Sequence, residues 1–452
     1  MGTPAPVRAA DGASPYRAPA RALGVLTGLL RRPMASYYLL LASAGLLLGL
    51  GLIMVLSASS IDSYASSGSA FTIFTKQLIF ALIGIPAFWL ALRLPMRVWP
   101  MLGWPLMVVA MVLLLLLPFI GTEVNQAKLW LQFGPITLQP VEVAKLALAL
   151  WGAAVLVRKR PLLTEWRHLA VPLLVGSGLL FALVGIEDFG GMILLLLILV
   201  ALLWTAGVRF RVFAILGAIA VVGVVPLLAG NSQRISRLTS FTDPFAHQDH
   251  GGYQIVRGFY ALGTGGWWGL GLGQSREKWG DLPEAHNDFI FAVIGEELGV
   301  LGCLVVVALF GVLAYAGVRV ASRVDDPFRR LVAAACTVWL AGQALVNMGC
   351  VVGLLPITGV PLPLISAGGS SLVLTMFVVG MLASFARHEP EAVLALHARG
   401  RAWWVRWAGI PLPELTGRPG WARQQLRSGR AGRPLSRLSG RTASRTRTGG
   451  RR

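Results

Sequence analysis

The feature that most constrains this chain is a series of apolar runs, most of them close to the ~20 residues that an α-helix needs to cross the hydrocarbon core of a bilayer. Of the 452 residues, 55% are hydrophobic and 13% are charged, whereas a soluble protein carries about 25% charged residues. The sequence therefore predicts an all-α polytopic membrane protein with about ten transmembrane helices. The predicted spans are residues 36–57, 70–92, 99–119, 141–157, 169–186, 190–206, 212–230, 287–316, 330–352 and 371–386.

Basic residues in the loops between these spans are distributed unevenly. If the N-terminus is cytoplasmic, the short outer loops hold only Lys128, and the other cations of the short loops fall on the inner side. Inner loops of membrane proteins carry a surplus of Lys and Arg, so the pattern predicts that both termini are cytoplasmic. The inner-loop cations are Arg93, Arg97, Arg158, Lys159, Arg160, Arg167, Arg209, Arg211, Arg319, Arg323, Arg329 and Arg330.

The chain divides into three predicted parts. Residues 1–35 lack the compact apolar core and cleavage site of a signal peptide, so we expect a disordered cytoplasmic segment and an uncleaved first span. Residues 36–388 form the membrane domain. Residues 389–452 are rich in Arg, which predicts a disordered cytoplasmic tail that either contacts anionic lipid of the inner leaflet or stays in solvent.

One outer connection, residues 231–286 between the seventh and eighth spans, is far longer than an ordinary loop and is therefore expected to be functional. It carries Trp267, Trp268 and Trp279 together with many glycines. Its segment 253–262 places apolar residues on one helical face, which predicts a helix lying in the membrane interface. The alternative is a mobile, exposed loop.

The stretch from Asp281 to Gly299 combines helix-start signals with acidic residues that continue into an apolar run. Asp281, followed by proline and by Glu284, predicts a capped helix beginning near residue 283. Carboxylates in spanning segments are functional candidates by default. We therefore take Asp288, one turn into this predicted helix, as the chemical centre. Of the next acids, Glu296 and Glu297, we expect one to line a cavity and the other to pack against a neighbouring span.

Two further groups of charged residues lie at outer helix ends. Glu142 and Lys145 are three residues apart, on one face of the fourth span, where they can pair. The pair is either structural or a binding site for a phosphate. Asp188, in the tight turn between the fifth and sixth spans, is expected to cap a helix.

Residues 353–371 connect the last two spans on the outer side. Their prolines and glycines exclude a continuous helix. Irregular backbone at membrane depth survives only against protein or a wet cavity, so we expect a re-entrant lining of the same outer cavity. The three cysteines, Cys303, Cys336 and Cys350, have no metal-ligand spacing and are expected to act as small packing residues.

Together these motifs resemble the SEDS family (shape, elongation, division and sporulation) over residues 36–388. The sequence around Asp288 and the Arg-rich tail resemble the FtsW division branch more than the RodA elongation branch. The motifs are Leu282-Pro283-Glu284-Ala285-His286-Asn287-Asp288-Phe289, Gly295-Glu296-Glu297-Leu298-Gly299, Gln139-Pro140-x-Glu142-x-x-Lys145, Asp243-Pro244, Tyr253-Gln254, Asn347 and Leu362-Pro363-Leu364-Ile365-Ser366-x-Gly368-Gly369. One departure concerns residues 127–130, where Lys128 stands in place of the usual arginine pair.

The resemblance implies a peptidoglycan glycosyltransferase that polymerises lipid II during septal wall synthesis and releases undecaprenyl pyrophosphate. Asp288 would be the general base of an inverting displacement. A divalent cation, Mg²⁺ or Mn²⁺, would be shared by Asp288 and Glu142 if one is used, although the sequence shows no dedicated metal site. The substrate-binding candidates are Glu142, Lys145, Lys128, Arg234, Arg237, Glu284, Glu296, Ser366 and Gly368.

The implied partners are a class B penicillin-binding protein and other membrane proteins of the division machinery, and the implied location is the plasma membrane at the septum. We expect no nucleic acid partner. Two other functions remain open at this stage. The same charged residues would serve a lipid II flippase, with Glu142, Lys145 and Glu296 as a proton relay, or the chain would be a non-catalytic scaffold.

Overall fold

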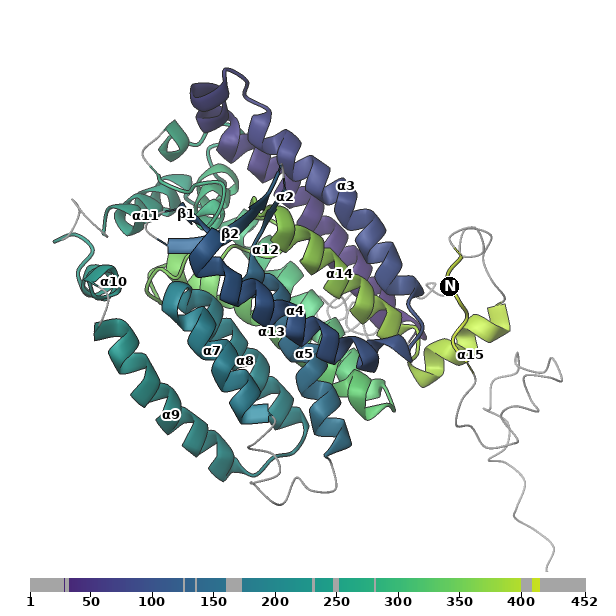
Figure 1. The fold of residues 1–452 in the computed structure, drawn as a ribbon. Coiled ribbons are helices and arrows are strands. Elements are labelled where there is room, and N and C mark those ends of the chain that lie inside the picture. The colour runs from purple at the N-terminus through teal and green to yellow at the C-terminus, as the bar shows by residue number, and fades with distance from the viewer. Residues whose placement is uncertain are drawn as a thin grey trace, which may run out of the picture.

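The computed structural model describes residues 28, 32–124, 127–134, 136–159, 173–229, 232–246, 252–279, 282–399 and 409–414, and the description below concerns these residues. They form a helical bundle with one small sheet (Figure 1). Its first half contains α2 (Ala35–Ser67), α3 (Thr72–Arg93), α4 (Val98–Ile120), β1 (Thr122–Val124), β2 (Ala127–Phe133), β3 (Ile136–Leu138), α5 (Pro140–Arg158), α7 (Val175–Glu187) and α8 (Phe189–Thr205). Its second half contains α9 (Phe210–Ala229), α10 (Ser232–Thr242), α11 (Tyr253–Gly265), the 3₁₀ turn η3 (Glu277–Trp279), α12 (Ile290–Arg323), α13 (Pro327–Val351), α14 (Gly369–Ala386) and α15 (Pro390–Arg399).

Among the described residues, seven helices are long and apolar enough to cross a bilayer. They are α2, α3, α4, α5, α12, α13 and α14, and each coincides with a predicted span. The apolar helices α7, α8 and α9 fall in the other three predicted spans. The polytopic, helical fold class is therefore confirmed, while the number ten stays a prediction.

Helix α5 is the centre of the bundle. Each residue from Pro140 to Leu156 is buried, and α5 contacts α4, α8, α13 and α14. Figure 1 shows α4, α5, α8 and α13 running side by side. A helix that is apolar on all sides is stable only when it is surrounded, and small residues let its neighbours approach closely. A methyl group at Gly103 of α4, for example, would lie 3.0 Å from the Cα of Trp151.

Helices α3 and α4 lie at the periphery of the bundle, and one side of each is exposed and apolar. Ile79, Leu82 and Ile83 of α3 are about half exposed. Helices with this pattern bury one face against protein and present the other to lipid. On its inner face α3 packs closely on α14, where Gly380 faces the backbone of Phe88.

The loop between α4 and α5 contains a three-stranded antiparallel sheet in the order β1–β2–β3, which the sequence analysis did not predict. Thr122 lies opposite Trp130, and Leu131 lies opposite Leu138. The strands are short and lie outside the apolar runs, so the hydropathy pattern does not indicate them. The sheet pairs the backbone of the loop that connects α4 and α5.

Helix α12 differs from its predicted bounds at both ends. It begins at Ile290, residues 283–289 form turns, and the helix continues to Arg323. The predicted helix start near residue 283 is wrong because Glu284 has a φ of 56°, in the left-handed region that a helix start does not use. Asp281, the expected cap, lies outside the described residues.

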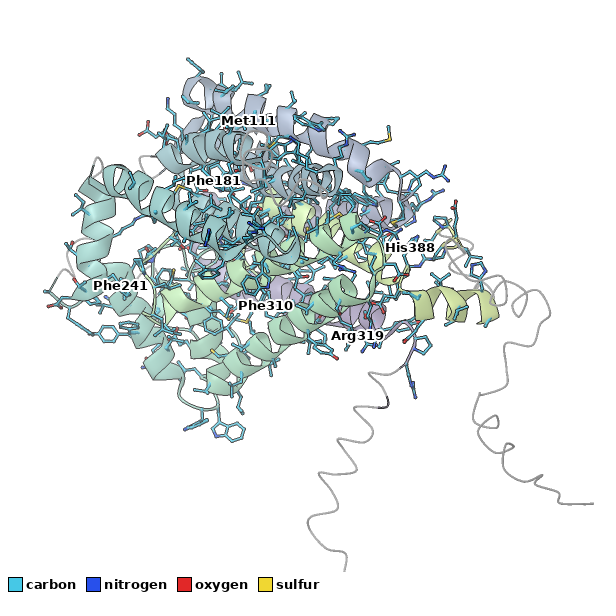
Figure 2. The ribbon with its side chains drawn as sticks, turned by 90° about the horizontal axis from the view of Figure 1, so that it is seen from below. Met111, Phe181, Phe241, Phe310, Arg319 and His388 are labelled. Carbon is cyan, nitrogen blue, oxygen red and sulfur yellow. The ribbon has the colours of Figure 1, made fainter. Side chains whose placement is uncertain are left out.

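The two ends of the bundle are distinct, and they are named inner and outer below after the predicted topology. Figure 2 shows Arg319 and His388 at the end that carries α15, and Phe241 of α10 at the opposite end. The prediction that the chain is disordered from residue 389 onward is wrong for two segments, α15 and residues 409–414. Ile410 is buried, and Arg387 Nη2 donates to Pro411 O at 3.1 Å. Trp403, Trp404 and Trp407 of the tail lie outside the described residues, so the choice between lipid contact and solvent for this segment stays a prediction.

The close contact between α2 and residues 364–365 gives a testable prediction. A methyl group at Gly51 would lie 2.5 Å from Leu364 O and 2.6 Å from Ile365 Cα, and both atoms are backbone. We expect Gly51→Ala to destabilise the protein by about 1–3 kcal/mol, because the loop must move. The matched control is Gly49→Ala, two residues away in the same helix, which meets nothing within 4 Å.

Alanine favours helix over glycine, so Gly49→Ala should keep or raise the melting temperature in detergent, while Gly51→Ala lowers it. Equal melting temperatures for the two variants would show that the loop is not held against α2.

Candidate active site at the outer end of the bundle

The turn at residues 283–289, which carries Asp288, is held by the loop that precedes α14. Ala367 N donates to His286 O at 2.9 Å. Ser366 Oγ donates to the next carbonyl, Asn287 O, at 2.7 Å. Two successive carbonyl groups of the turn are therefore fixed by residues far away in the sequence.

A third carbonyl of the same turn is held from α13. Asn347 Nδ2 donates to Asp288 O and to Val360 O, both at 2.8 Å. One amide therefore connects the backbone of the acidic residue to the loop of residues 352–368. The Cβ position of Gly359, in that loop, lies 3.6 Å from Asp288 Oδ2, so the loop also passes close to the carboxylate.

The loop of residues 352–368 is in turn fixed to α3. Gln77 Nε2 donates to Ser366 O at 3.1 Å, and Gly368 N donates to Gln77 Oε1 at 3.2 Å. Leu362 N donates to Ser366 Oγ at 2.8 Å. As expected, the loop is irregular and lies against protein. Ser366 and Gly368, which were candidates for substrate binding, are buried and engaged in these bonds, so here they position the turn of Asp288.

The predicted ion pair between Glu142 and Lys145 is present in α5, with Lys145 Nζ 2.7 Å from Glu142 Oε1. Lys145 Nζ also donates to Gln343 Oε1 at 2.9 Å and lies 5.0 Å from the centre of the Trp339 ring. Gln343 Nε2 donates to Pro361 O at 2.9 Å. The pair thus supports the loop next to Asp288.

The exposed fractions of Glu142 and Lys145 are 2% and 1%. Both charges are therefore paired inside the bundle rather than exposed at its surface. In this conformation the geometry supports the structural interpretation of the pair.

Glu296 and Glu297 are both fully buried, so the expectation that one of them lines a cavity is wrong. Glu296 accepts hydrogen bonds from Ser275 Oγ at 2.5 Å and from Arg276 N at 2.8 Å. The reason is local: the outer loop folds back over the start of α12 and uses the carboxylate of Glu296 as its anchor.

Glu297 faces the other side of α12 and joins three elements. It accepts from Ser57 Oγ of α2 at 2.6 Å and lies 3.3 Å from Lys278 Nζ. Lys278 Nζ also donates to Gly273 O at 2.7 Å. This carboxylate therefore does pack against a neighbouring span, as one of the two acids was expected to do.

Asp288 itself is partly exposed and carries a perturbed carboxyl group. Burial is the main cause that raises the pKa of Asp288 to about 7, and the Glu284 carboxylate adds to it, while Arg237 lowers it and Asp188 raises it. Asp288 is therefore affected by Glu284 of its own turn and by groups from two other elements, Arg237 of α10 and Asp188 at the start of α8. A carboxyl group with a pKa near neutrality is suited to accept a proton.

The remaining predicted residues lie around this centre. Glu284 is half-buried and accepts from Asn287 Nδ2 at 2.5 Å. Asp188 accepts from Gly191 N at 2.7 Å at the start of α8, which confirms its role as a helix cap. In β2, Lys128 Nζ donates to Pro118 O at 2.8 Å. Arg237 is exposed on α10, whereas the side chain of Arg234 lies outside the described residues.

Two cavities lie among the described residues. A cavity of about 550 Å³ lies at the inner end, lined among others by Arg97, Asp326, Arg329, Arg387, His388 and Glu414. A pocket beside Asp188, at the outer end, has about 10 Å³.

Gln343 and Gln77 belong to the site but were missed by the sequence analysis. Both are buried amides in predicted spans. Polar residues inside spans are functional candidates by default, so the same criterion that selected the carboxylates would have found them.

The fold and the site define a class of protein: a polytopic membrane protein with a carboxylate-centred site at the outer end of its bundle. The family model for the cell cycle proteins FtsW, RodA and SpoVE matches residues 37–391. The chain belongs to the FtsW/RodA/SpoVE family, which confirms the resemblance seen in its motifs.

Curated relatives agree with this assignment. The chain is 43% identical over 388 residues to a Mycobacterium tuberculosis protein named probable peptidoglycan glycosyltransferase FtsW, covering 85% of this chain and 74% of that protein. It is 36% identical over 350 residues to the stage V sporulation protein E of Bacillus subtilis, covering 76% and 95% of the two chains.

Two solved structures have the same fold. One is described as the structural coordination of polymerization and crosslinking by a peptidoglycan synthase complex, with a TM-score of 0.63, 25% identity and coverage of 77% of this chain and 96% of the other. The other is the rod shape determining protein RodA of Thermus thermophilus, with a TM-score of 0.58, 25% identity and coverage of 78% and 96%.

The buried pair in α5 gives a second testable prediction. Lys145→Met removes the cation and leaves Glu142 buried without it, which we expect to destabilise the protein by about 3–5 kcal/mol. The control is Arg323→Gln at the inner end, where Arg323 pairs with Glu391 at exposed fractions of 37% and 61%. Loss of an exposed pair should change stability by about 1 kcal/mol or less. Similar unfolding midpoints in detergent for both variants would contradict the supporting role of Lys145.

Proposed function

We propose that this chain is a peptidoglycan glycosyltransferase that polymerises lipid II during septal wall synthesis, with Asp288 as the general base. The observation that carries the proposal is a partly exposed carboxyl group with a pKa near 7 on a turn whose backbone is fixed by three hydrogen bonds. The names of the relatives supply the reaction, and the position of Asp288 supplies the role.

In the proposed step, a sugar hydroxyl of one lipid II attacks the anomeric carbon of another glycan chain. Asp288 takes the hydroxyl proton, the new C–O bond forms, and the bond to the pyrophosphate breaks with inversion at carbon. One base and no covalent nucleophile are enough for a single displacement. A well-placed base contributes about 10²–10⁴-fold to the rate.

Positive charge is needed where the pyrophosphate leaves. Arg237 is close enough to Asp288 to lower the pKa of the Asp288 carboxyl group. The side chain of Arg237 is exposed to solvent. Arginine suits phosphate oxygens because it can donate two parallel hydrogen bonds. We assign Arg237 to the leaving group, with Arg234 and Lys128 as further candidates from the same end of the bundle.

A divalent cation was a further candidate at this site. Among the described residues, no group of three His, Cys, Asp or Glu side chains is arranged to hold a metal ion, and Glu142 is paired in the interior. These residues do not fit a dedicated metal site, so no step of the proposed mechanism uses one.

The proposed topology places both termini in the cytoplasm, because the end that carries α15 also carries most of the loop arginines. We further propose a septal location and a crosslinking partner, a class B penicillin-binding protein. The support for the partner is the structural relative described as a complex that coordinates polymerization and crosslinking.

The proposal is tested by Asp288→Asn in purified protein supplied with lipid II in detergent. We expect a loss of glycan polymer of at least about 100-fold, because the amide cannot accept the proton. The control is Asp325→Asn, an exposed acid of the inner loop, which should keep full activity. Near-normal polymerisation by folded Asp288→Asn protein would exclude the base role, and absence of polymer from wild-type protein would favour the flippase or scaffold alternatives.

The pKa of Asp288 gives two pH dependences with opposite signs. The polymerisation rate should rise as the pH passes about 7, where Asp288 loses its proton. The free energy of unfolding should fall as the pH rises from about 4 to about 7. Over this range Asp288 keeps its proton in the folded protein, whereas the unfolded chain releases it at pH ~3.9. Melting temperatures against pH, for wild type and Asp288→Asn, should show this decline reduced in the variant. Parallel curves would show that the pKa of Asp288 is not raised in the folded protein.

A further inference from the structure

The outer loop between α11 and α12, residues 265–279, presents large apolar side chains that no described element covers. Trp267, Trp268 and Trp279 are 69%, 82% and 72% exposed. Leu270 and Leu272 of the same loop are also exposed. A cluster of this kind on a folded protein marks a surface that meets a membrane or a partner.

The backbone of this tryptophan loop is held firmly against α12. Leu270 N donates to Glu296 O, and Gly271 N donates to Glu297 O, both at 2.9 Å. Gly269 has a φ of 77°, and a methyl group there would collide with Glu297 O. The loop is therefore fixed in place with its tryptophans exposed, rather than being a mobile segment.

The level of the loop along α12 follows from two more backbone bonds. Val300 N donates to Gly266 O at 2.9 Å, and Leu301 N donates to Trp267 O at 3.4 Å. These bonds fall just after Gly299, where the backbone of α12 is non-helical with a φ of 68°. The tryptophans are thus attached at the point where the first, buried part of α12 ends.

Beyond this point α12 presents an apolar surface to the outside. Its exposed residues include Val300, Leu301, Leu304, Val305, Val307, Val312, Tyr315 and Val318. The helix from Leu301 to Arg319 is about 27 Å long at ~1.5 Å per residue. This length is close to the ~30 Å hydrocarbon thickness of a bilayer. Trp267 therefore lies level with the outer edge of the surface that meets lipid.

Helix α2 gives an independent measure of the same level. Ser57 of α2 bonds to Glu297, one turn before Leu301. The helix from Ala35 to Ser57 is about 33 Å long at ~1.5 Å per residue. Both helices therefore place the start of the tryptophan loop near the outer boundary of the hydrocarbon, if they cross the bilayer without strong tilt.

We propose that Trp267 and Trp268 insert into the outer-leaflet interface and anchor the extracytoplasmic loop to lipid. Tryptophan is enriched at membrane interfaces because its ring is largely apolar while its N–H reaches polar groups. We assign lipid as the partner of these tryptophans because they adjoin the exposed apolar surface of α12 at the end of that surface near Leu301. The helix that the sequence placed in the interface, α11, instead packs its apolar residue Ile255 into the protein.

The anchor has a consequence for the active site, which rests on the proposed function. The tryptophan loop is joined to α12 between Glu296 and Leu301, and α12 begins two residues after Asp288. An anchor at this point fixes the height of Asp288 above the bilayer. The pyrophosphate of a lipid-linked substrate also has a fixed height in the interface. The outer boundary of the bilayer therefore sets both the height of Asp288 and the height of the pyrophosphate.

The anchor is tested by spin labels on the full-length protein in phosphatidylglycerol/phosphatidylcholine nanodiscs, in a Cys303→Ala background. A label at Trp268→Cys should collide readily with oxygen and poorly with a water-soluble nickel chelate. A control label at Arg276→Cys, exposed on the same loop, should show the reverse. Equal access of nickel to both labels would overturn the proposal. A label at 268 that becomes protected only when the transpeptidase partner is added would overturn it in favour of a protein interface.

A second measurement separates the anchor from the proposed function. Trp267→Ser/Trp268→Ser protein should polymerise lipid II like wild type in detergent and at least about fivefold more slowly in nanodiscs, because only a bilayer has an interface to define the height. Equal rates in nanodiscs would overturn the claim that the anchor sets this height. If wild-type protein makes no polymer, the proposed function fails, while the spin-label result still decides the anchor.

Discussion

Irregular backbone buried among membrane helices has no water to satisfy its hydrogen bonds, and the active-site end of this protein depends on how that requirement is met. The loop of residues 352–368 cannot bond within itself as a helix does. Asn347, Gln343 and Gln77, from two different helices, bond to its backbone instead. Because Asn347 also bonds to Asp288 O, the same amide that satisfies the loop places the acid.

The charged pair of α5 is part of this arrangement. A buried lysine and glutamate are costly unless each is paired and hydrogen-bonded. The ion pair of Lys145 with Glu142 and its hydrogen bond to Gln343 offset the cost of burying the lysine, and Gln343 in turn donates to Pro361 O. A chain of contacts therefore runs from the central helix to the loop beside Asp288, which explains why ionisable residues are found in a helix that is buried on all sides.

A second group of buried charges holds the other side of the site. Glu296 and Glu297 fix the outer loop to α12 and, through Ser57, to α2. With the turn held by one group and the following helix held by the other, Asp288 is constrained from both directions. This constraint fits the general-base role proposed for Asp288, which requires a fixed position and an altered pKa.

Much of the architecture was determined by the sequence alone. Apolar runs of membrane length predict the spans because hydrocarbon thickness sets their length, and the i, i+3 spacing of Glu142 and Lys145 predicts their pairing because a helix places such residues on one face. The cap at Asp188 also follows from local pattern, as does the choice of Asp288 as the candidate base. The motifs around them were sufficient to predict the family.

Tertiary structure alone decided the rest. The helix starts at Ile290 because the carbonyl groups of the preceding turn, at residues 286, 287 and 288, accept from residues 367, 366 and 347. Ser366 and Glu296 became positioning groups because their partners are contributed by other segments. Ser57 and Glu297, which bond directly, are 240 residues apart. Local pattern reports which face of a helix is apolar, but it does not report which distant donor meets a buried acceptor, and at this site those meetings set the geometry.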